Sequence, residues 1–325
     1  MADLDPIVLT GGSTSVAIIP ALGGKIASLR LAGREWLWTS DVIAHAPPTD
    51  AVAADDAVSY VLTADTGGYD ECFPTVGACA VPPAVAGAGG VRLPDHGELW
   101  AQRPAVTVDR AGGRARAVVA WEGRRLPYAF VRECEVHGDG RVELRYAVTN
   151  RGAARLPFLW SAHPLLPLTA GTRLELPDGA RTRVYAEHGI SLGGARSEHQ
   201  WPFVEVGGVT RSLAHPARVA DGYACKLFLD LPAGARRLAV EEDDARLEVE
   251  LDPGEVTHFG LWLNNRGWTP FAGGAPYRNF AFEPCIGAPD TLDDALGAWG
   301  AAAWLEAGAT RRWTLTWRGE RAGAR

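Results

Sequence analysis

The chain has 325 residues, of which 47% are hydrophobic and 22% charged, so it can bury a sizeable core. A net charge of -7 without a long basic run argues against nucleic acid or an anionic membrane as a partner. The stretch from Met1 to Pro6 does not resemble a signal peptide, and no apolar run reaches membrane-spanning length. Five cysteines without a CxxC pair favour reduced thiols, so we expect a cytoplasmic protein.

Alternating apolar and polar residues, separated by turn residues, run through nearly the whole chain. Residues 8–19 predict a hairpin around a Gly-Gly turn, and residues 25–31 predict the next strand. Residues 41–69 and 77–95 are rich in Ala, Asp, Pro and Gly, and we expect long loops there. Residues 130–150 form the clearest hairpin, around His-Gly-Asp-Gly.

The C-terminal third continues the alternation at residues 246–252 and 313–317. Only the segment from Thr291 to about Trp299 predicts a helix, with Thr291 as its cap and two aspartates in its first turn. We expect the tail after Arg318 to be frayed. No shift in composition divides the chain, so residues 1–325 predict a single domain. Its class is all-β, a large antiparallel β-sandwich with very little helix.

Glu283 stands at the end of the apolar stretch Phe280-Ala281-Phe282 and is followed by Pro284. In a strand the two phenylalanines share one face, and Glu283 lies on the other. Pro284 lacks a backbone donor, so we expect regular strand pairing to stop there. A carboxylate at the end of a buried strand is costly to leave unsatisfied. Glu283 is therefore either held by backbone donors or an Arg, or it acts as a general base.

Two histidines stand in comparable settings. In the segment 158–164, Ser161 and His163 share one strand face opposite the aromatic residues, and Pro164 is expected to end the strand. His96 lies in a loop between a Pro turn and a Gly. Either histidine taken alone is more often a structural residue with satisfied hydrogen bonds than a catalytic one. The residues around it are needed to distinguish the two roles.

Three further residues stand out. Trp262 shares a strand face with His258 and Asn264, and it is either a core residue or a platform for the apolar face of a sugar ring. Lys226 lies within an apolar run and is either an edge-strand residue, which we favour slightly, or a charge aimed at a ligand. Asp70 follows Gly-Gly-Tyr and could stabilise a turn.

Motifs of several other chemistries are absent from the sequence. It contains no GxGxxG, P-loop or HExxH pattern. The eight histidines and the carboxylates show no recognisable metal-ligand spacing, so we predict no metal site.

Taken together, these segments resemble the aldose 1-epimerase (galactose mutarotase-like) family. The matching segments, in order, are Gly23 to Leu29, Asp70 to Pro74, Asp95 to Trp100, Ser161 to Pro164, and Glu283-Pro284 followed by Gly287 and Pro289-Asp290. Each segment is short, and their order and spacing over residues 15–317 make the match specific. The resemblance implies a twisted β-sandwich with a sugar site on a concave sheet face, and no cofactor.

The resemblance also implies roles for individual residues. Glu283 matches the catalytic base of the family, His163 its catalytic acid, and His96 a second histidine that binds the sugar near its ring oxygen. In these roles His163 must be protonated and Glu283 ionised at the working pH.

The sequence departs from the family at two positions. The Arg that family members carry near the first histidine has no clear match here, where Trp100 and Arg103 lie nearby. Asp221 and Asp230 lie in the interval where the family has a hydroxyl-clamping Asp, but neither sits in a recognisable motif. Asp70 and Lys226 are therefore the alternative candidates for ligand contacts in this chain.

The resulting hypothesis is a mutarotase that interconverts the α and β anomers of a hexose or hexose derivative through acid–base ring opening. The partner is then a small sugar, and the protein is a monomer or homodimer. One alternative is a non-catalytic sugar-binding or sugar-sensing protein with the same fold. A polysaccharide lyase or a glycosidase is less well supported, because a glycosidase needs two carboxylates across the scissile bond.

Overall fold

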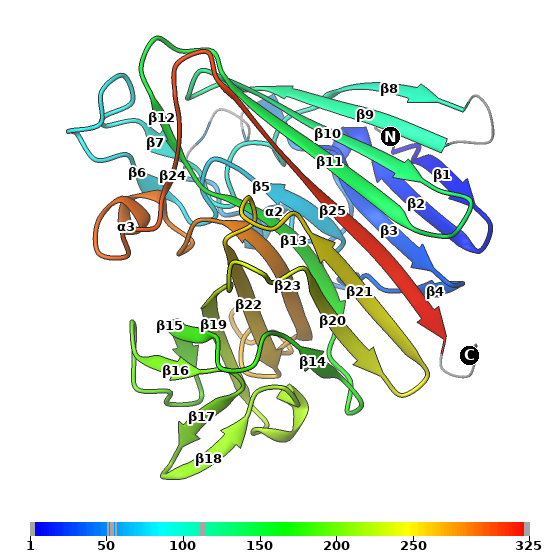
Figure 1. The fold of residues 1–325 in the computed structure, drawn as a ribbon, viewed down its shortest axis with the longest axis vertical. Coiled ribbons are helices and arrows are strands. Elements are labelled where there is room, and N and C mark those ends of the chain that lie inside the picture. The colour runs from blue at the N-terminus through cyan, green and yellow to red at the C-terminus, as the bar shows by residue number, and fades with distance from the viewer. Residues whose placement is uncertain (1–3, 51, 53–54, 56, 111–114, 322–325) are drawn as a thin grey trace.

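The computed structural model describes residues 4–50, 52, 55, 57–110 and 115–321, which form two large antiparallel sheets around a shared core (Figure 1). The first sheet has 13 strands. In spatial order they are β1 (Ile7–Gly11), β2 (Thr14–Ile19), β3 (Lys25–Leu31), β5 (Tyr69–Cys72), β13 (Trp160–Pro167), β23 (Arg278–Ile286), β22 (His258–Asn265), β19 (Tyr223–Asp230), β15 (Arg181–His188), β16 (Glu198–Gln200), β17 (Phe203–Val206) and β18 (Val209–Ser212), with β4 (Arg34–Glu35) paired to β3.

The second sheet has eight strands. In spatial order they are β14 (Arg173–Glu175), β20 (Arg237–Glu242), β21 (Ala245–Leu251), β25 (Thr310–Arg321), β11 (Val142–Asn150), β10 (Tyr128–Val136), β9 (Ala115–Glu122) and β8 (Ala105–Asp109). Two small sheets pair β12 (Leu156–Phe158) with β24 (Ala303–Leu305), and β6 (Cys79–Ala80) with β7 (Arg92–Leu93).

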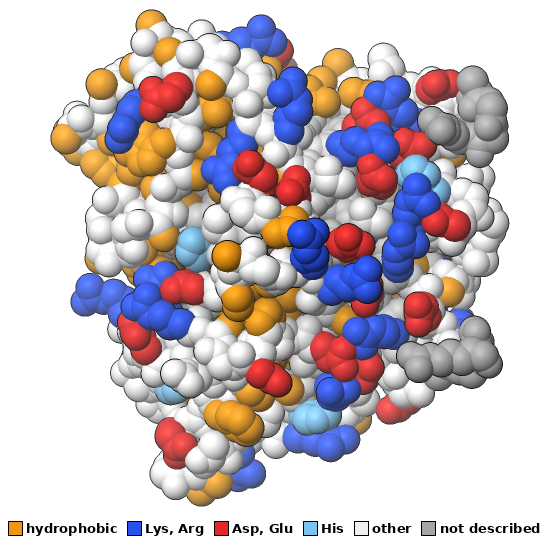
Figure 2. All heavy atoms as spheres, in the orientation of Figure 1, with side chains coloured by type: hydrophobic (Ala, Val, Ile, Leu, Met, Phe, Trp, Pro, Cys, Tyr) orange, Lys and Arg blue, Asp and Glu red, His pale blue; other side chains and the backbone are white. Residues whose placement is uncertain are grey.

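Helix is confined to short segments among the described residues. Besides the helical positions 50 and 52, these are α2 (Tyr60–Thr63), α3 (Leu292–Leu296) and the 3₁₀ turns η1 (Pro20–Leu22) and η3 (Pro216–Arg218). No helix in the described part of the chain is long and apolar enough to cross a membrane. On the face drawn in Figure 2, Lys and Arg side chains lie among Asp and Glu side chains.

The predicted antiparallel β-sandwich is confirmed, and so are its clearest hairpins. β1 pairs with β2 around the Gly-Gly turn, and β10 pairs with β11 in register from Tyr128 opposite Asn150 to Val136 opposite Val142. The alternation in β21 and β25 also holds, because the apolar residues of both strands are buried between the sheets. Alternation predicted the fold because each sheet buries one face and leaves the other for polar side chains.

Two prolines do not end their strands as predicted. Pro164 lies inside β13 and pairs with Tyr69 of β5, and Pro284 lies inside β23 and pairs with Phe259 of β22. Between β13 and β23 the register passes from Ser161 opposite Cys285 to Leu165 opposite Ala281, without pairs in the interval that contains both prolines. Each proline is tolerated because its missing donor falls in this gap, while the strand stays paired on its other side.

Two ends differ from the sequence prediction, and one helix was not expected. Helix α3 stops at Leu296 with Gly297 as its C-cap, short of Trp299. The last strand continues through Arg321, which pairs with Ala245, so residues 319–321 are not frayed. Residues 322–325, the rest of the expected tail, lie outside the described residues. Helix α2 arises within the expected loop 41–69, of which residues 51, 53–54 and 56 also lie outside the described residues.

An ion pair joins the two sheets across the core. Arg132 of β10 donates to Glu71 of β5, with Nη1 3.2 Å from Oε1, and both side chains are almost fully buried. Tyr146 donates to the same oxygen at 3.0 Å, and Trp160 donates to Oε2 at 2.9 Å. Burial raises the pKa of Glu71 to about 7, although Arg132 acts in the opposite direction.

We predict that Arg132→Met lowers the free energy of unfolding by about 3–5 kcal/mol, because it leaves Glu71 buried without its cation. The measurement is urea denaturation, with exposed Arg211→Met as the control, expected to cost no more than about 0.5 kcal/mol. The double variant Arg132→Met with Glu71→Gln should lose less than Arg132→Met alone. A cost for Arg132→Met equal to that of the control would contradict this account.

Candidate functional site

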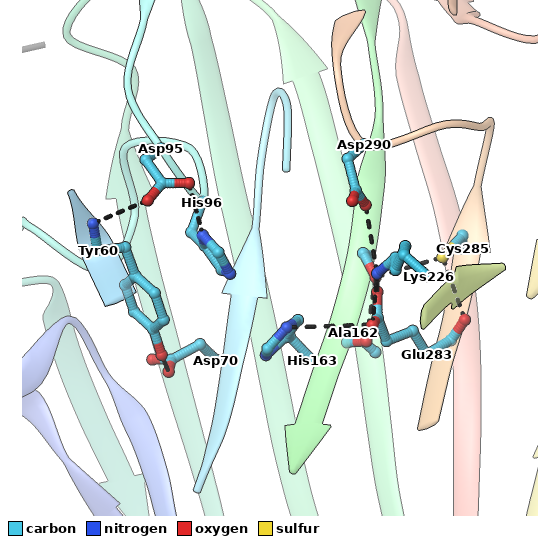
Figure 3. A network of polar contacts seen from close by, with 11 residues as sticks. Tyr60, Asp70, Asp95, His96, Ala162, His163, Lys226, Glu283, Cys285 and Asp290 are labelled. Atoms are coloured by element: carbon cyan, nitrogen blue, oxygen red, sulfur yellow. Dashed lines mark hydrogen bonds and ion pairs between the residues drawn. The ribbon is translucent and has the colours of Figure 1, made fainter. Parts of the chain in front are cut away.

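The candidate site lies on the face of the 13-stranded sheet that points away from the core, over the central strands β5, β13, β23, β22 and β19. Residues directly opposite each other in an antiparallel pair share a face. The register therefore brings together five of the residues predicted from the sequence: Asp70, His163, Glu283, Trp262 and Lys226. The sixth, His96, comes from the loop after β7 and lies above this face (Figure 3).

Glu283 is completely buried, and its carboxylate is held by protein donors. Lys226 Nζ lies 2.6 Å from Oε1 and 2.7 Å from Oε2, and Ser161 donates to Oε2 at 3.0 Å. Gly260 lies opposite in β22, where a Cβ atom would come within 2.9 Å of Oε2, so glycine leaves room for the carboxylate. Glu283 is not among the described residues that line the cavity described below, whereas its partner Lys226 is.

Lys226 is not on an edge strand, so the favoured reading of this residue was wrong. Strand β19 lies between β22 and β15, and Lys226 is buried there. Its Nζ bridges Glu283 and Asp290 Oδ1, which lies 3.2 Å away (Figure 3). Burial alone would lower the pKa of Lys226, but the carboxylates of Asp290 and Glu283 raise it above its ordinary value. Lys226 is therefore an ammonium group whose charge is shared by two carboxylates.

His163 lies between Glu283 and the cavity. Its Nε2 is 4.0 Å from Glu283 Oε1, and its Nδ1 has no hydrogen-bond partner among the described residues. Burial, and then the nearby charges of His96 and Lys226, lower the pKa of His163 well below its ordinary value. This setting disfavours the protonated imidazole that the role of catalytic acid requires.

His96 has the opposite electrostatic setting. Its Nδ1 lies 2.9 Å from Asp95 Oδ1, and its ring stacks on Tyr60 with 4.1 Å between centroids. Burial alone would lower the pKa of His96, but the carboxylate of Asp95 raises it above the ordinary value. The backbone of His96 is left-handed, with φ of 60°, and Gly97 follows with φ of 72°. This turn aims the ring at His163, with 5.0 Å between the ring centroids.

Asp70 lies on the same sheet face as the site but outside its cavity. It lies in strand β5, not in a turn, and it is paired with Lys25 and with the hydroxyl of Tyr60. Asp70 is buried and does not line the cavity that His96 and His163 share. It therefore anchors Tyr60 beneath the ring of His96.

A cavity of about 210 Å³ opens over the two histidines. Trp262 lines it, as the platform reading predicts, and so do the aromatic residues Trp268, Tyr185 and Tyr277. Trp262 and Trp268 meet edge to face, with 5.6 Å between ring centroids. Polar lining comes from His96, His163, Lys226, Asn279, Asp65, Asp95 and Asp290. Aromatic faces beside polar groups suit a ligand with apolar faces and hydroxyl edges, such as a sugar ring.

Three aspartates of the cavity were not predicted as site residues, and one of them, Asp95, adjoins the predicted His96. Asp290 follows β23 and Pro289, and only its presence in the family-like segment could have drawn attention to it. Asp65 follows α2 in the Ala-rich loop, where the sequence shows no period and no motif. The two aspartates that the sequence did suggest lie elsewhere, because Asp221 pairs with Arg266 and Asp230 with Arg183.

No family model and no curated protein matches this sequence. Solved structures do match it over nearly the whole chain. The Slr1438 protein of Synechocystis sp. PCC 6803 superposes with a TM-score of 0.68 at 16% identity, covering 98% of both chains. A galactose mutarotase related enzyme from Lactobacillus acidophilus gives 0.63 at 12% identity, covering 97% of both chains.

A galactose mutarotase-like protein from Lactobacillus casei gives a TM-score of 0.61 at 16% identity, covering 97% of this chain and 100% of its own. At such identities the likeness shows the fold and leaves the activity to be argued from the site. The chain has the galactose mutarotase-like β-sandwich fold that its sequence resembles.

Proposed function

We propose that this protein interconverts the anomers of an aldose by general acid–base ring opening. The observation that carries the proposal is the pair of histidines at the cavity wall, whose pKa values are moved in opposite directions. Titratable groups whose environments separate their pKa values mark the acid and the base of a site. Mutarotation needs one of each, placed on opposite sides of a hemiacetal.

In this proposal His96 is the acid and His163 the base. The imidazolium of His96 donates a proton to the ring oxygen while Nδ1 of His163 accepts the proton of the C1 hydroxyl. The C1–O5 bond breaks to give the open-chain aldehyde, and rotation about C1–C2 presents its other face. Closure then returns both protons by the reverse steps. These roles differ from those that the resemblance implies, in which Glu283 is the base and His163 the acid.

Glu283 acts here as a positioning residue behind His163. Its carboxylate lies on the Nε2 side of the imidazole, and the buried Nδ1 has no hydrogen-bond partner among the described residues. An ionised carboxylate near Nε2 favours the tautomer with its proton on Nε2 and stabilises the imidazolium that forms during the reaction. Direct proton abstraction by Glu283 would require Lys226 to move away from both carboxylate oxygens.

A second candidate function is sugar binding without turnover. One observation favours it: Lys226 covers the carboxylate that the resemblance assigns as the base. The names of the structural neighbours support the enzyme, since one of them is called a galactose mutarotase related enzyme. Sugar-induced thermal stabilisation without any acceleration of mutarotation would establish the binding function instead.

The first test follows freshly dissolved α-glucose and α-galactose by polarimetry and exchange NMR. We expect the wild-type protein to accelerate mutarotation, and His96→Gln and His163→Gln each to lower the rate about 10²–10⁴-fold, because each removes one proton-transfer group. Exposed His188→Gln is the control and should keep the wild-type rate. Glu283→Gln should lose less than His163→Gln. An equal or larger loss would return the role of base to Glu283.

The pH profile tests the two protonation states. Activity needs neutral His163, so kcat/KM should fall as the pH drops through the pKa of His163, which burial places well below 6.5. It also needs protonated His96, so kcat/KM should fall again as the pH rises through the pKa of His96, which Asp95 holds above 6.5. The measurement is the enzyme-dependent rate after subtraction of the blank. A kcat/KM that rises as the pH drops through the pKa of His163 would contradict the assignment.

The source of the low pKa of His163 can be tested without activity. Lys226→Met removes a cation that lowers this pKa and exposes His163 to the charge of Glu283, so the pKa of His163 should rise. NMR titration of the histidine Cε1–H signals gives the value, with the signal assigned from His163→Gln. Arg211→Met, on strand β18, is the control. An unchanged pKa in Lys226→Met would show that burial alone sets it.

A further inference from the structure

The cations of the cavity are already neutralised by protein carboxylates. Lys226 is shared between Glu283 and Asp290, and His96 is paired with Asp95. No arginine occurs among the described residues that line the cavity. A phosphate or carboxylate on the ligand would therefore find no cation to bind without breaking an ion pair that is largely buried, which is costly.

Hydrogen-bond acceptors, in contrast, are left open in the cavity. Among the described residues, Asp65 Oδ1 and Asn279 Oδ1 are buried and lack a hydrogen-bond partner. Asp65 is 6% exposed and Asn279 is 2% exposed. Buried acceptors of this kind are costly unless a ligand or water satisfies them, so the cavity is built for a ligand rich in donors.

Asp65 is the most informative of these residues. Its carboxylate lines the cavity, and no described Lys, Arg or His forms an ion pair with it. Burial raises the pKa of Asp65, with the charges of Lys25 and His96 acting in the opposite direction. A buried carboxylate without a paired cation is satisfied best by a cation from the ligand. Three lining carboxylates, from Asp65, Asp95 and Asp290, face only Lys226 and His96, so the balance of lining charge is also acidic.

We propose that the cavity prefers a sugar that carries a protonated amino group, with Asp65 accepting from the ammonium, and that it discriminates against sugar phosphates. This rests on the proposed function, since it names the substrate class of the same site. The ammonium supplies donors to open acceptors and a positive charge to an acidic lining. A neutral hexose supplies donors only, and a hexose 6-phosphate places an anion where no free cation exists.

The test compares four sugars with the full-length protein: glucosamine, N-acetylglucosamine, glucose and glucose 6-phosphate. Affinity is measured by calorimetry and mutarotation by exchange NMR, at a pH where the amine of glucosamine is protonated. A charge-assisted hydrogen bond predicts that glucosamine binds about tenfold to a hundredfold more tightly than glucose. N-acetylglucosamine, which keeps the nitrogen but loses the charge, should not share this gain, and glucose 6-phosphate should bind most weakly.

The role of Asp65 is tested by Asp65→Asn, which keeps the shape of the side chain. The ratio of the glucosamine and glucose affinities should fall at least tenfold in this variant, whereas exposed Asp178→Asn should keep the wild-type ratio. Thermal unfolding checks that both variants fold. A second readout needs no variant: in the wild-type protein the preference for glucosamine should disappear when the pH is raised until the amine is neutral.

The outcomes separate this inference from the proposed function. Glucose 6-phosphate binding as tightly as glucosamine, or an unchanged affinity ratio in Asp65→Asn, would overturn the substrate class even if mutarotation is accelerated. The predicted order of affinities without any acceleration would support the substrate class and overturn the proposed enzyme activity.

Discussion

The ammonium group of Lys226 determines the charge of the whole site. It lies within 2.7 Å of both oxygens of Glu283 and 3.2 Å from Asp290, in a place where none of these charges could be buried alone. Its charge also adds to the burial that lowers the pKa of His163. His96 has its own carboxylate, Asp95, which raises its pKa.

The sheet makes this arrangement possible by leaving a gap in its own ladder. His163 and Glu283 both lie in the interval where β13 and β23 have no registered pairs, and each is followed by a proline. The prolines thus mark the place where the two central strands separate, although neither strand ends there. Gly260 provides the remaining space, because a side chain at this position would meet the carboxylate of Glu283. The order of strands, the prolines and one glycine together create room for polar groups in the middle of a sheet.

The fold and the faces of several site residues could be predicted from the sequence, because the two-residue alternation of side chains along a strand is a local property. Parity placed Glu283 and His163 on the outer face, and the alternation of apolar residues predicted the sandwich. Parity does not reveal which strands become neighbours, so the contact between Lys226 and Glu283 could not be foreseen, and Lys226 was taken for an edge residue. Asp65 could not be found either, because it lies in a loop where no periodic pattern applies. The protonation of the histidines depends on three-dimensional neighbours that the sequence does not specify.

Strand β5 carries two acidic residues in succession, and each belongs to a different part of the molecule. Asp70 faces outward to Lys25 and Tyr60, whereas Glu71 faces the core and joins Arg132 of the other sheet. A slip of β5 by one residue would exchange these faces. Both acids would then leave their cations, and Arg132 and Lys25 would lose their partners at the same time. The two adjacent acidic residues therefore favour one register of this four-residue strand, the register in which Asp70 pairs at the site and Glu71 pairs in the core.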